Sequence, residues 1–148
     1  MRNLVRSQRG PGVGSEAGFT LIELLVVLGI IALLMALVAP QVIRYLSEAK
    51  SETAAVQVKN LESALELFYL DTGEYPASET GLQALMESPR DAKGWHGPYL
   101  KHASGLVDPW GRPYIYRVPG THGKYDIYSL GRDGVEGGED ENGDVTSW

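Results

Sequence analysis

The pattern of apolar and polar positions divides the 148-residue chain into a helical first half and a turn-rich second half. Residues 19–39 form a predominantly apolar run in which Glu23 is the only charged side chain. As an α-helix this run extends roughly 31 Å, close to the ~30 Å hydrocarbon core of a bilayer. The run therefore predicts a membrane-spanning helix. Its single acid needs an explanation, because burying a charge in lipid is costly.

Beyond this run, apolar residues recur at three- and four-residue steps, which predicts that the helix continues. Pro40 removes one backbone N–H and is expected to kink or loosen the helix. The helix should end near residues 71–73, where Gly73 can take the C-terminal cap. The predicted apolar stripe comprises Leu46, Ala49, Thr53, Val56, Leu61, Ala64, Leu65 and Phe68.

The second half predicts a short helix and a β-hairpin. Residues 81–88, GLQALMES, precede Pro89 and are expected to form the helix. The stretches RPYIYRV at 112–118 and KYDIYSL at 124–130 flank a turn and predict two antiparallel strands. We expect an α+β fold, with a long N-terminal helix packed on a small antiparallel sheet. Aromatic residues should supply the bulk of its core: Tyr75, Trp95, Tyr99, Trp110, Tyr114, Tyr116, Tyr125 and Tyr128.

Composition and charge exclude several classes of function. The formal net charge is −6 and no basic cluster is present, which argues against nucleic acid as a partner. The absence of cysteine excludes disulfide frameworks, thiolate zinc sites and cysteine nucleophiles. His96, His102 and His122 are dispersed, and no HExxH or GxSxG motif accompanies them. The sequence therefore predicts that the chain is not an enzyme.

The charges around the apolar run predict its orientation. Arg2, Arg6 and Arg9 precede it, and the next basic residues after it are Arg44 and Lys50. By the positive-inside bias, the N-terminus lies in the cytoplasm and the remainder of the chain on the other side of the membrane. The prediction is a single-pass membrane protein whose C-terminal part faces away from the cytoplasm.

Two simple interpretations of the apolar run remain open at this point. A cleaved secretory signal peptide would need a small-residue site, which Ala36 and Val38 mimic. The run is too long for that interpretation and passes directly into a further helical pattern, so an uncleaved signal anchor fits better. Neither interpretation accounts for Glu23 or for Gly18 immediately before the run.

The motif GFTLIE at 18–23, followed by the uncharged helix, resembles the class III signal of type IV pilins and type II secretion pseudopilins. This resemblance implies that a prepilin peptidase cuts between Gly18 and Phe19 and methylates the amine of Phe19. Glu23 then becomes the fifth residue and can neutralise that amine on an adjoining subunit, because a paired buried charge costs less than an isolated one. The alternative is an acid that reaches the membrane interface from the first helical turn.

The second half narrows the resemblance to one branch of the type IV pilin-like superfamily. The stretches at 70–89, 94–100, 108–120 and 125–144 resemble, in this order, the major pseudopilins of type II secretion systems. The resemblance covers nearly the whole chain from Gly18 onward. Type IVa pilins usually close their C-terminal region with a disulfide, so the absence of cysteine favours a pseudopilin.

Residues 133–144 carry the only constellation that suggests a cofactor. Six carboxylates are interleaved with glycines, and oxygen-only ligands on a flexible backbone suit Ca²⁺. The stretch DENGD begins like an EF-hand loop, but Val145 stands where the invariant glycine belongs. A solvated acidic loop without metal is the alternative.

Resemblance to the major pseudopilins implies one calcium ion in this loop. The side-chain ligands would then be Asp133 and Asp140, with Glu141 or Asp144 as alternates to Asp140. Backbone carbonyls would complete the coordination shell: those of Leu130, Val135 and Gly138.

Taken together, these features predict a leader at 1–18, a transmembrane and filament-core helix at 19–40, and a periplasmic domain at 41–148. The implied function is the major structural subunit of a type II secretion pseudopilus, which polymerises after processing and drives export of folded proteins across the outer membrane. Implied partners are further copies of the chain, minor pseudopilins, the prepilin peptidase, an inner-membrane platform with its ATPase, and the outer-membrane secretin. The alternatives are a type IV pilus subunit, a minor pseudopilin, or a signal-anchored periplasmic calcium-binding module.

Overall fold

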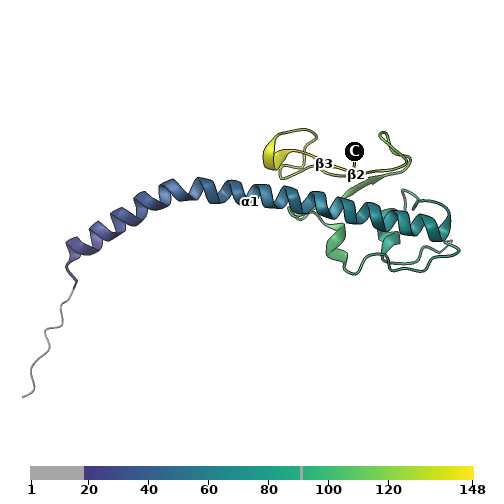
Figure 1. Cartoon of the computed structure of the whole chain (residues 1–148), viewed down its shortest axis with the longest axis horizontal. Coiled ribbons are helices and arrows are strands. Elements are labelled where there is room, and N and C mark those ends of the chain that lie inside the picture. The colour runs from purple at the N-terminus through teal and green to yellow at the C-terminus, as the bar shows by residue number, and fades with distance from the viewer. Residues whose placement is uncertain (1–18, 91) are drawn as a thin grey trace, which may run out of the picture. The chain divides into compact units, whose positions relative to one another are not determined.

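A computed structural model describes residues 19–90 and 92–148, so the predicted leader at 1–18 lies outside the described residues. Helix α1 (Leu21–Thr72) comes first in the chain and is followed by short elements (Figure 1). The described chain divides between Ala39 and Pro40 into two units. The short elements all belong to the second unit: the 3₁₀ turns η1 (Gly81–Leu85), η2 (Ala103–Leu106) and η3 (Asp140–Asn142), and the strands β1 (Ile115–Arg117), β2 (Asp126–Ser129) and β3 (Val145–Thr146).

In the first unit, no described element covers helix α1. Its N-terminus is capped by Thr20, whose Oγ1 accepts the backbone N–H of Glu23 at 3.3 Å. Every residue from Phe19 to Leu46 is exposed. Within the part of the chain that the structure describes, α1 is the one helix long and apolar enough to cross a membrane.

The second half of α1 carries the core of the second unit. Its buried residues are Ala54, Val58, Leu61, Ala64, Leu65 and Phe68. The last four were predicted, but the predicted burial of Leu46, Ala49, Thr53 and Val56 is wrong, because all four are exposed. The true stripe continues backwards in steps of four and three residues to Ala54, whereas Val56 is turned by about 200° from Val58 on a 3.6-residue helix. Leu46 and Ala49 precede the part of α1 that contributes to the core.

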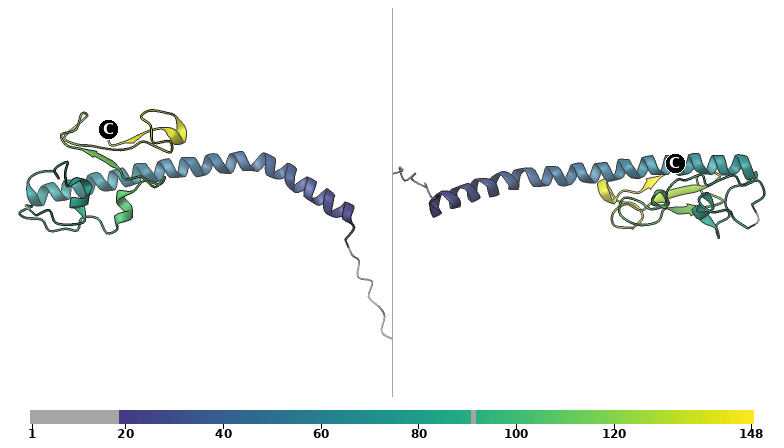
Figure 2. Two further views of the ribbon diagram at one scale, coloured as in Figure 1. Left: turned by 180° about the vertical axis from the view of Figure 1, so that it is seen from behind. Right: turned by 90° about the horizontal axis from the view of Figure 1, so that it is seen from below.

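Three antiparallel strands pack on this stripe in the order β1-β2-β3 (Figure 2). Ile115 pairs with Tyr128 and Arg117 with Asp126, which confirms the predicted hairpin. All four residues of the central strand β2 are buried, and Ile127 is fully enclosed with Leu61 and Leu65 of α1. Strand β3 was not predicted, because its two residues are too few for a periodic pattern.

Residues 81–88 were expected to form a helix, and the structure has the shorter 3₁₀ turn η1 there. Short pieces are the usual length for 3₁₀ structure, and the turn still buries Leu82 and Leu85. The predicted helix end is confirmed: α1 ends at Thr72, and Gly73 follows with φ of 84° and donates its N–H to the Tyr69 carbonyl.

Seven of the eight predicted aromatic core residues are buried or pack against the core. Their polar ends find partners: Tyr114 donates its hydroxyl to Gln57 Oε1 at 2.7 Å, and the indole of Trp95 donates to the Ala84 carbonyl at 3.0 Å. The eighth, Trp110, lies outside the core cluster and contacts the acidic loop instead.

Candidate functional site

The first candidate site is the beginning of α1. Phe19 and Glu23 are one helical turn apart and both are exposed, while Gly18 lies outside the described residues. Glu23 forms no ion pair with any described residue of the same chain. The described part of the chain therefore offers this carboxylate no counter-charge on the apolar helix surface.

The second candidate site is the loop that joins β2 to β3. Its backbone has positive φ at five positions, Gly131, Gly134, Gly137, Gly138 and Asp140, with values of 59°, 73°, 94°, 90° and 54°. At Gly138 a Cβ atom would lie 2.5 Å from the carbonyl oxygen of Asn142, so the loop is closed too tightly there for any side chain. The glycines interleaved with the acids thus fix a tight conformation.

Two of the predicted side-chain ligands organise the loop itself. Asp133 Oδ1 accepts the backbone N–H of Val135 at 3.1 Å, and Asp144 Oδ2 accepts that of Gly137 at 2.9 Å. Asp140 lies exposed at the start of η3. These bonds leave each of the two aspartates its second carboxylate oxygen.

Glu141 is already engaged. It accepts a hydrogen bond from the Trp110 indole at 3.4 Å and from Arg132 at 3.1 Å. Burial opposes ionisation of this carboxyl, but the bond from Trp110 and the charge of Arg132 outweigh it and hold the pKa of Glu141 below its ordinary value. Of the two alternates to Asp140, Asp144 is therefore the more available.

The other acids of the loop form no ion pair with a described basic residue. Ion pairs within residues 19–90 and 92–148 join His96 to Asp71, His122 to Asp126 and Arg132 to Glu141. Five exposed carboxylates of the loop thus have no cationic partner among the described residues: Asp133, Glu136, Glu139, Asp140 and Asp144.

The donor chemistry of the loop fits calcium, since every side-chain and backbone donor of the predicted set is an oxygen. No three His, Cys, Asp or Glu side chains among the described residues converge at metal-binding distance. The predicted set contains two carboxylates, so it relies on the carbonyls of Leu130, Val135 and Gly138. The Leu130 carbonyl also accepts the N–H of Gly134 at 3.1 Å. These ligand assignments stay a prediction.

A buried aspartate organises the turn that faces this loop. Asp108 accepts the backbone N–H groups of Trp110 and Arg112 on Oδ1 at 3.0 and 2.8 Å, and the Ser129 hydroxyl on Oδ2. Arg112 in turn donates its guanidinium to the carbonyls of Gly131 and Arg132. Sequence reasoning missed the contacts of Asp108 with Ser129 and of Arg112 with the loop carbonyls, because they join residues about 20 positions apart.

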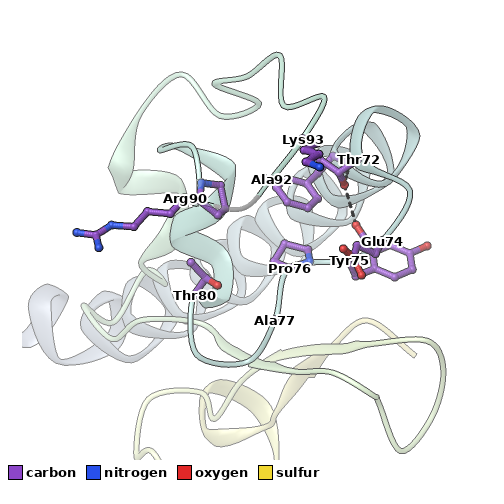
Figure 3. A pocket seen from close by; sticks show the side chains of 11 residues that line it. Thr72, Glu74, Tyr75, Pro76, Ala77, Thr80, Arg90, Ala92 and Lys93 are labelled. Atoms are coloured by element: carbon purple, nitrogen blue, oxygen red, sulfur yellow. Dashed lines mark hydrogen bonds between the residues drawn. The ribbon is translucent and has the colours of Figure 1, made fainter.

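A recess of about 670 Å³ lies elsewhere, around Thr72, Pro76 and Thr80 (Figure 3). The Thr72 hydroxyl lies 2.9 Å from the Glu74 carbonyl and 2.8 Å from the Phe68 carbonyl, so these two oxygens share its one hydrogen. Both bonds go to backbone oxygens, so no base activates this hydroxyl. The recess adds no chemistry to the two candidate sites.

Comparison with protein families decides the class. Residues 41–148 match the family described as Type II secretion system (T2SS), protein G, and residues 14–39 match the prokaryotic N-terminal methylation motif. This chain belongs to the type II secretion system protein G family. The second match includes Gly18, Phe19 and Glu23, the residues singled out in the GFTLIE motif.

Individual members of the protein G family are similar to this chain over most of its length. The type II secretion system core protein G of Pseudomonas aeruginosa is 44% identical over 137 residues, which cover 90% of this chain and 95% of that protein. That of Vibrio cholerae is 36% identical over 136 residues, covering 90% of this chain and 92% of the relative. The crystal structure of the major pseudopilin from enterohaemorrhagic Escherichia coli superposes with a TM-score of 0.59 at 32% identity, covering 69% of this chain and 85% of that one.

Membership of the protein G family confirms the central predictions. The chain has the pseudopilin fold and is a structural subunit of a type II secretion system rather than an enzyme or a type IV pilus subunit. The apolar half of α1 is the candidate membrane anchor.

Proposed function

We propose that the protein is made as a precursor that a prepilin peptidase cuts between Gly18 and Phe19, with methylation of the new Phe19 amine. The match to the N-terminal methylation motif over residues 14–39 supports this. Helix α1 begins at Leu21, so the cut would leave a charged amine at the start of an apolar helix. That amine would add its charge to the positive end of the helix dipole.

Assembly follows from the surface that processing leaves. The observation that carries the proposal is that every residue from Phe19 to Leu46 is exposed, while Glu23 is the one charge between Phe19 and Ala39. In the inner membrane, lipid covers this surface. In a filament, neighbouring copies cover it, and Glu23 meets the Phe19 amine of a neighbour. Pairing in an apolar medium recovers much of the cost of burying both charges.

The partners follow from this role. The subunits polymerise with one another and with minor pseudopilins. An inner-membrane platform and its ATPase extract them from the bilayer, and the growing pseudopilus pushes folded proteins through the outer-membrane secretin. The N-terminus faces the cytoplasm and residues 41–148 face the periplasm, in agreement with the arginines that precede the span.

We propose that the acidic loop binds one Ca²⁺ through Asp133, Asp140 and nearby carbonyls, with Asp144 as the better alternate to Asp140. This loop has five carboxylates without a cationic partner among the described residues and five positive φ angles, which supports the proposal. A bound cation would supply the missing positive charge and hold the loop closed on β2 and β3.

The experiment for the assembly role compares Glu23→Ala and Glu23→Gln with wild type in a cellular pseudopilus assay. Both variants should lower the assembled fraction about tenfold or more, because they leave the Phe19 amine without its counter-charge. Glu48→Ala, an exposed acid of the same helix beyond the apolar run, is the matched control and should assemble normally. Wild-type assembly of Glu23→Ala would refute the pairing.

A further inference from the structure

Arg112 reaches from the start of the hairpin into the acidic loop. Its guanidinium donates to two consecutive carbonyls, those of Gly131 and Arg132, in the forked geometry that only arginine offers. Gly131 is buried and Arg112 is half-buried, so these bonds lie at the protected base of the loop. One side chain thus fixes two adjoining peptide groups where β2 ends.

The loop also folds against the flat face of this guanidinium. A Cβ atom on Gly134 would lie 2.9 Å from Arg112 Cζ and 3.1 Å from Nε, and Gly134 has φ of 73°. The backbone therefore approaches the guanidinium more closely than any other residue at position 134 would allow. Arg112 is held by hydrogen bonds at residues 131 and 132 and by packing at 134.

Arg112 itself is held from the opposite side. Its backbone N–H donates to Asp108 Oδ1 at 2.8 Å and its carbonyl accepts the N–H of Asp108 at 2.7 Å. Asp108 is only 5% exposed and is anchored to β2 by the Ser129 hydroxyl. The chain from Ser129 through Asp108 to Arg112 ties the loop to the rigid sheet.

We propose that Arg112 is a positioning residue that sets the coordinating geometry of the acidic loop. The inference rests on the proposed calcium site. Arg112 contacts the loop at residues 131, 132 and 134. These positions lie between the proposed ligands Leu130, Asp133 and Val135, so the guanidinium fixes the peptides that separate the ligands. Arg112 donates no ligand atom, since a guanidinium has no acceptor.

A positioning role and a purely electrostatic role of Arg112 predict opposite changes in calcium affinity when Arg112 is replaced. Arg112 is a positive charge beside an acidic loop, so its removal should tighten cation binding if charge alone mattered. If Arg112 positions the ligands, its removal should weaken binding despite the more negative loop. Partners that orient metal ligands from outside the coordination shell typically contribute about 10- to 100-fold in affinity.

The test is calcium titration calorimetry on the full chain in detergent micelles. Arg112→Gln should weaken binding about 10- to 100-fold. Arg112→Lys keeps the charge but cannot donate to both carbonyls at once, so it should weaken binding as well. Arg117→Gln is the matched control: it removes the same charge from an exposed residue of β1 that lies over the Tyr128 ring.

The outcomes separate the two proposals. If wild type binds calcium and either Arg112 variant binds as tightly as wild type, the positioning role is wrong and the calcium site stands. If wild type binds no calcium, both the calcium site and the positioning role of Arg112 are wrong.

A second measurement follows the loop without metal. Amide hydrogen exchange in EDTA should be about tenfold faster at Val135 and Gly137 in Arg112→Gln than in Arg117→Gln. Equal rates would overturn the positioning role.

Discussion

Two buried aspartates show how single side chains organise the turns of this domain. Asp108 closes the turn before β1, and Asp126 closes the turn between β1 and β2. Asp126 is 2% exposed and accepts the N–H groups of Thr121 and His122 at 2.7 and 3.1 Å, together with a 3.2 Å contact to the His122 ring. Burial opposes ionisation, but these bonds outweigh it and hold the pKa of Asp126 below its ordinary value.

This lowered pKa gives a pH-dependent contribution to stability. It is fully present above the unfolded pKa of about 4 and is lost as the pH falls through the lower folded pKa. Asp126→Asn should therefore lower the melting temperature by several degrees at pH 7, and the difference from wild type should shrink in acid. Thermal denaturation of both chains between pH 7 and pH 2 checks this.

Glu52→Gln provides the control, because Glu52 is an exposed acid of α1. It should melt like wild type at every pH. A penalty for Asp126→Asn that stays constant down to the lowest pH would contradict the ionic role of Asp126.

Among the elements, helix α1 has two structurally different parts. Its first part exposes an apolar surface on all sides, and its last five turns bury a stripe against the sheet. The helix continues through Pro40, although proline has no N–H for the hydrogen bond to the preceding turn. The buried stripe packs α1 against η1 and β2.

The stripe makes a direct prediction about stability. Leu65 is fully buried and Leu67, two residues along the same helix, is 52% exposed. Leu65→Ala should lower the free energy of unfolding by about 2–5 kcal/mol, because it removes buried methyl groups and leaves a cavity. Leu67→Ala should cost much less. Denaturant unfolding of the two variants in detergent micelles measures the difference, and equal losses would place the core elsewhere.

How much of these elements could be predicted depends on how local their causes are. The hairpin was predictable, since both stretches are rich in β-prone residues and the turn motif PGTHG at 119–123 separates them. The N-terminal half of the apolar stripe was not, because several three- and four-residue registers fit residues 46–56. Only packing against the sheet selects Ala54 and Val58.

At the scale of the whole molecule, the two candidate sites could be predicted from the sequence, but the contacts that position their residues could not. The acids and glycines of the loop are contiguous, so they could be predicted from the sequence. Arg112 and Trp110 contact loop residues that lie 19 to 31 positions further along the chain. No local sequence pattern predicts contacts over such separations. Glu23 has no ion-pair partner among the described residues, so its proposed role in assembly could not be read from contacts within one chain.

The account of the whole molecule centres on one processing event. We propose that this event makes the amine that pairs with Glu23 and converts a membrane anchor into a filament subunit. The most direct measurement is mass spectrometry of the N-terminus of the protein isolated from membranes. We predict a chain that begins at Phe19 and carries one N-methyl group. A chain that retains Met1, or one cut near Ala36 or Val38 as a secretory signal would be, would contradict the account.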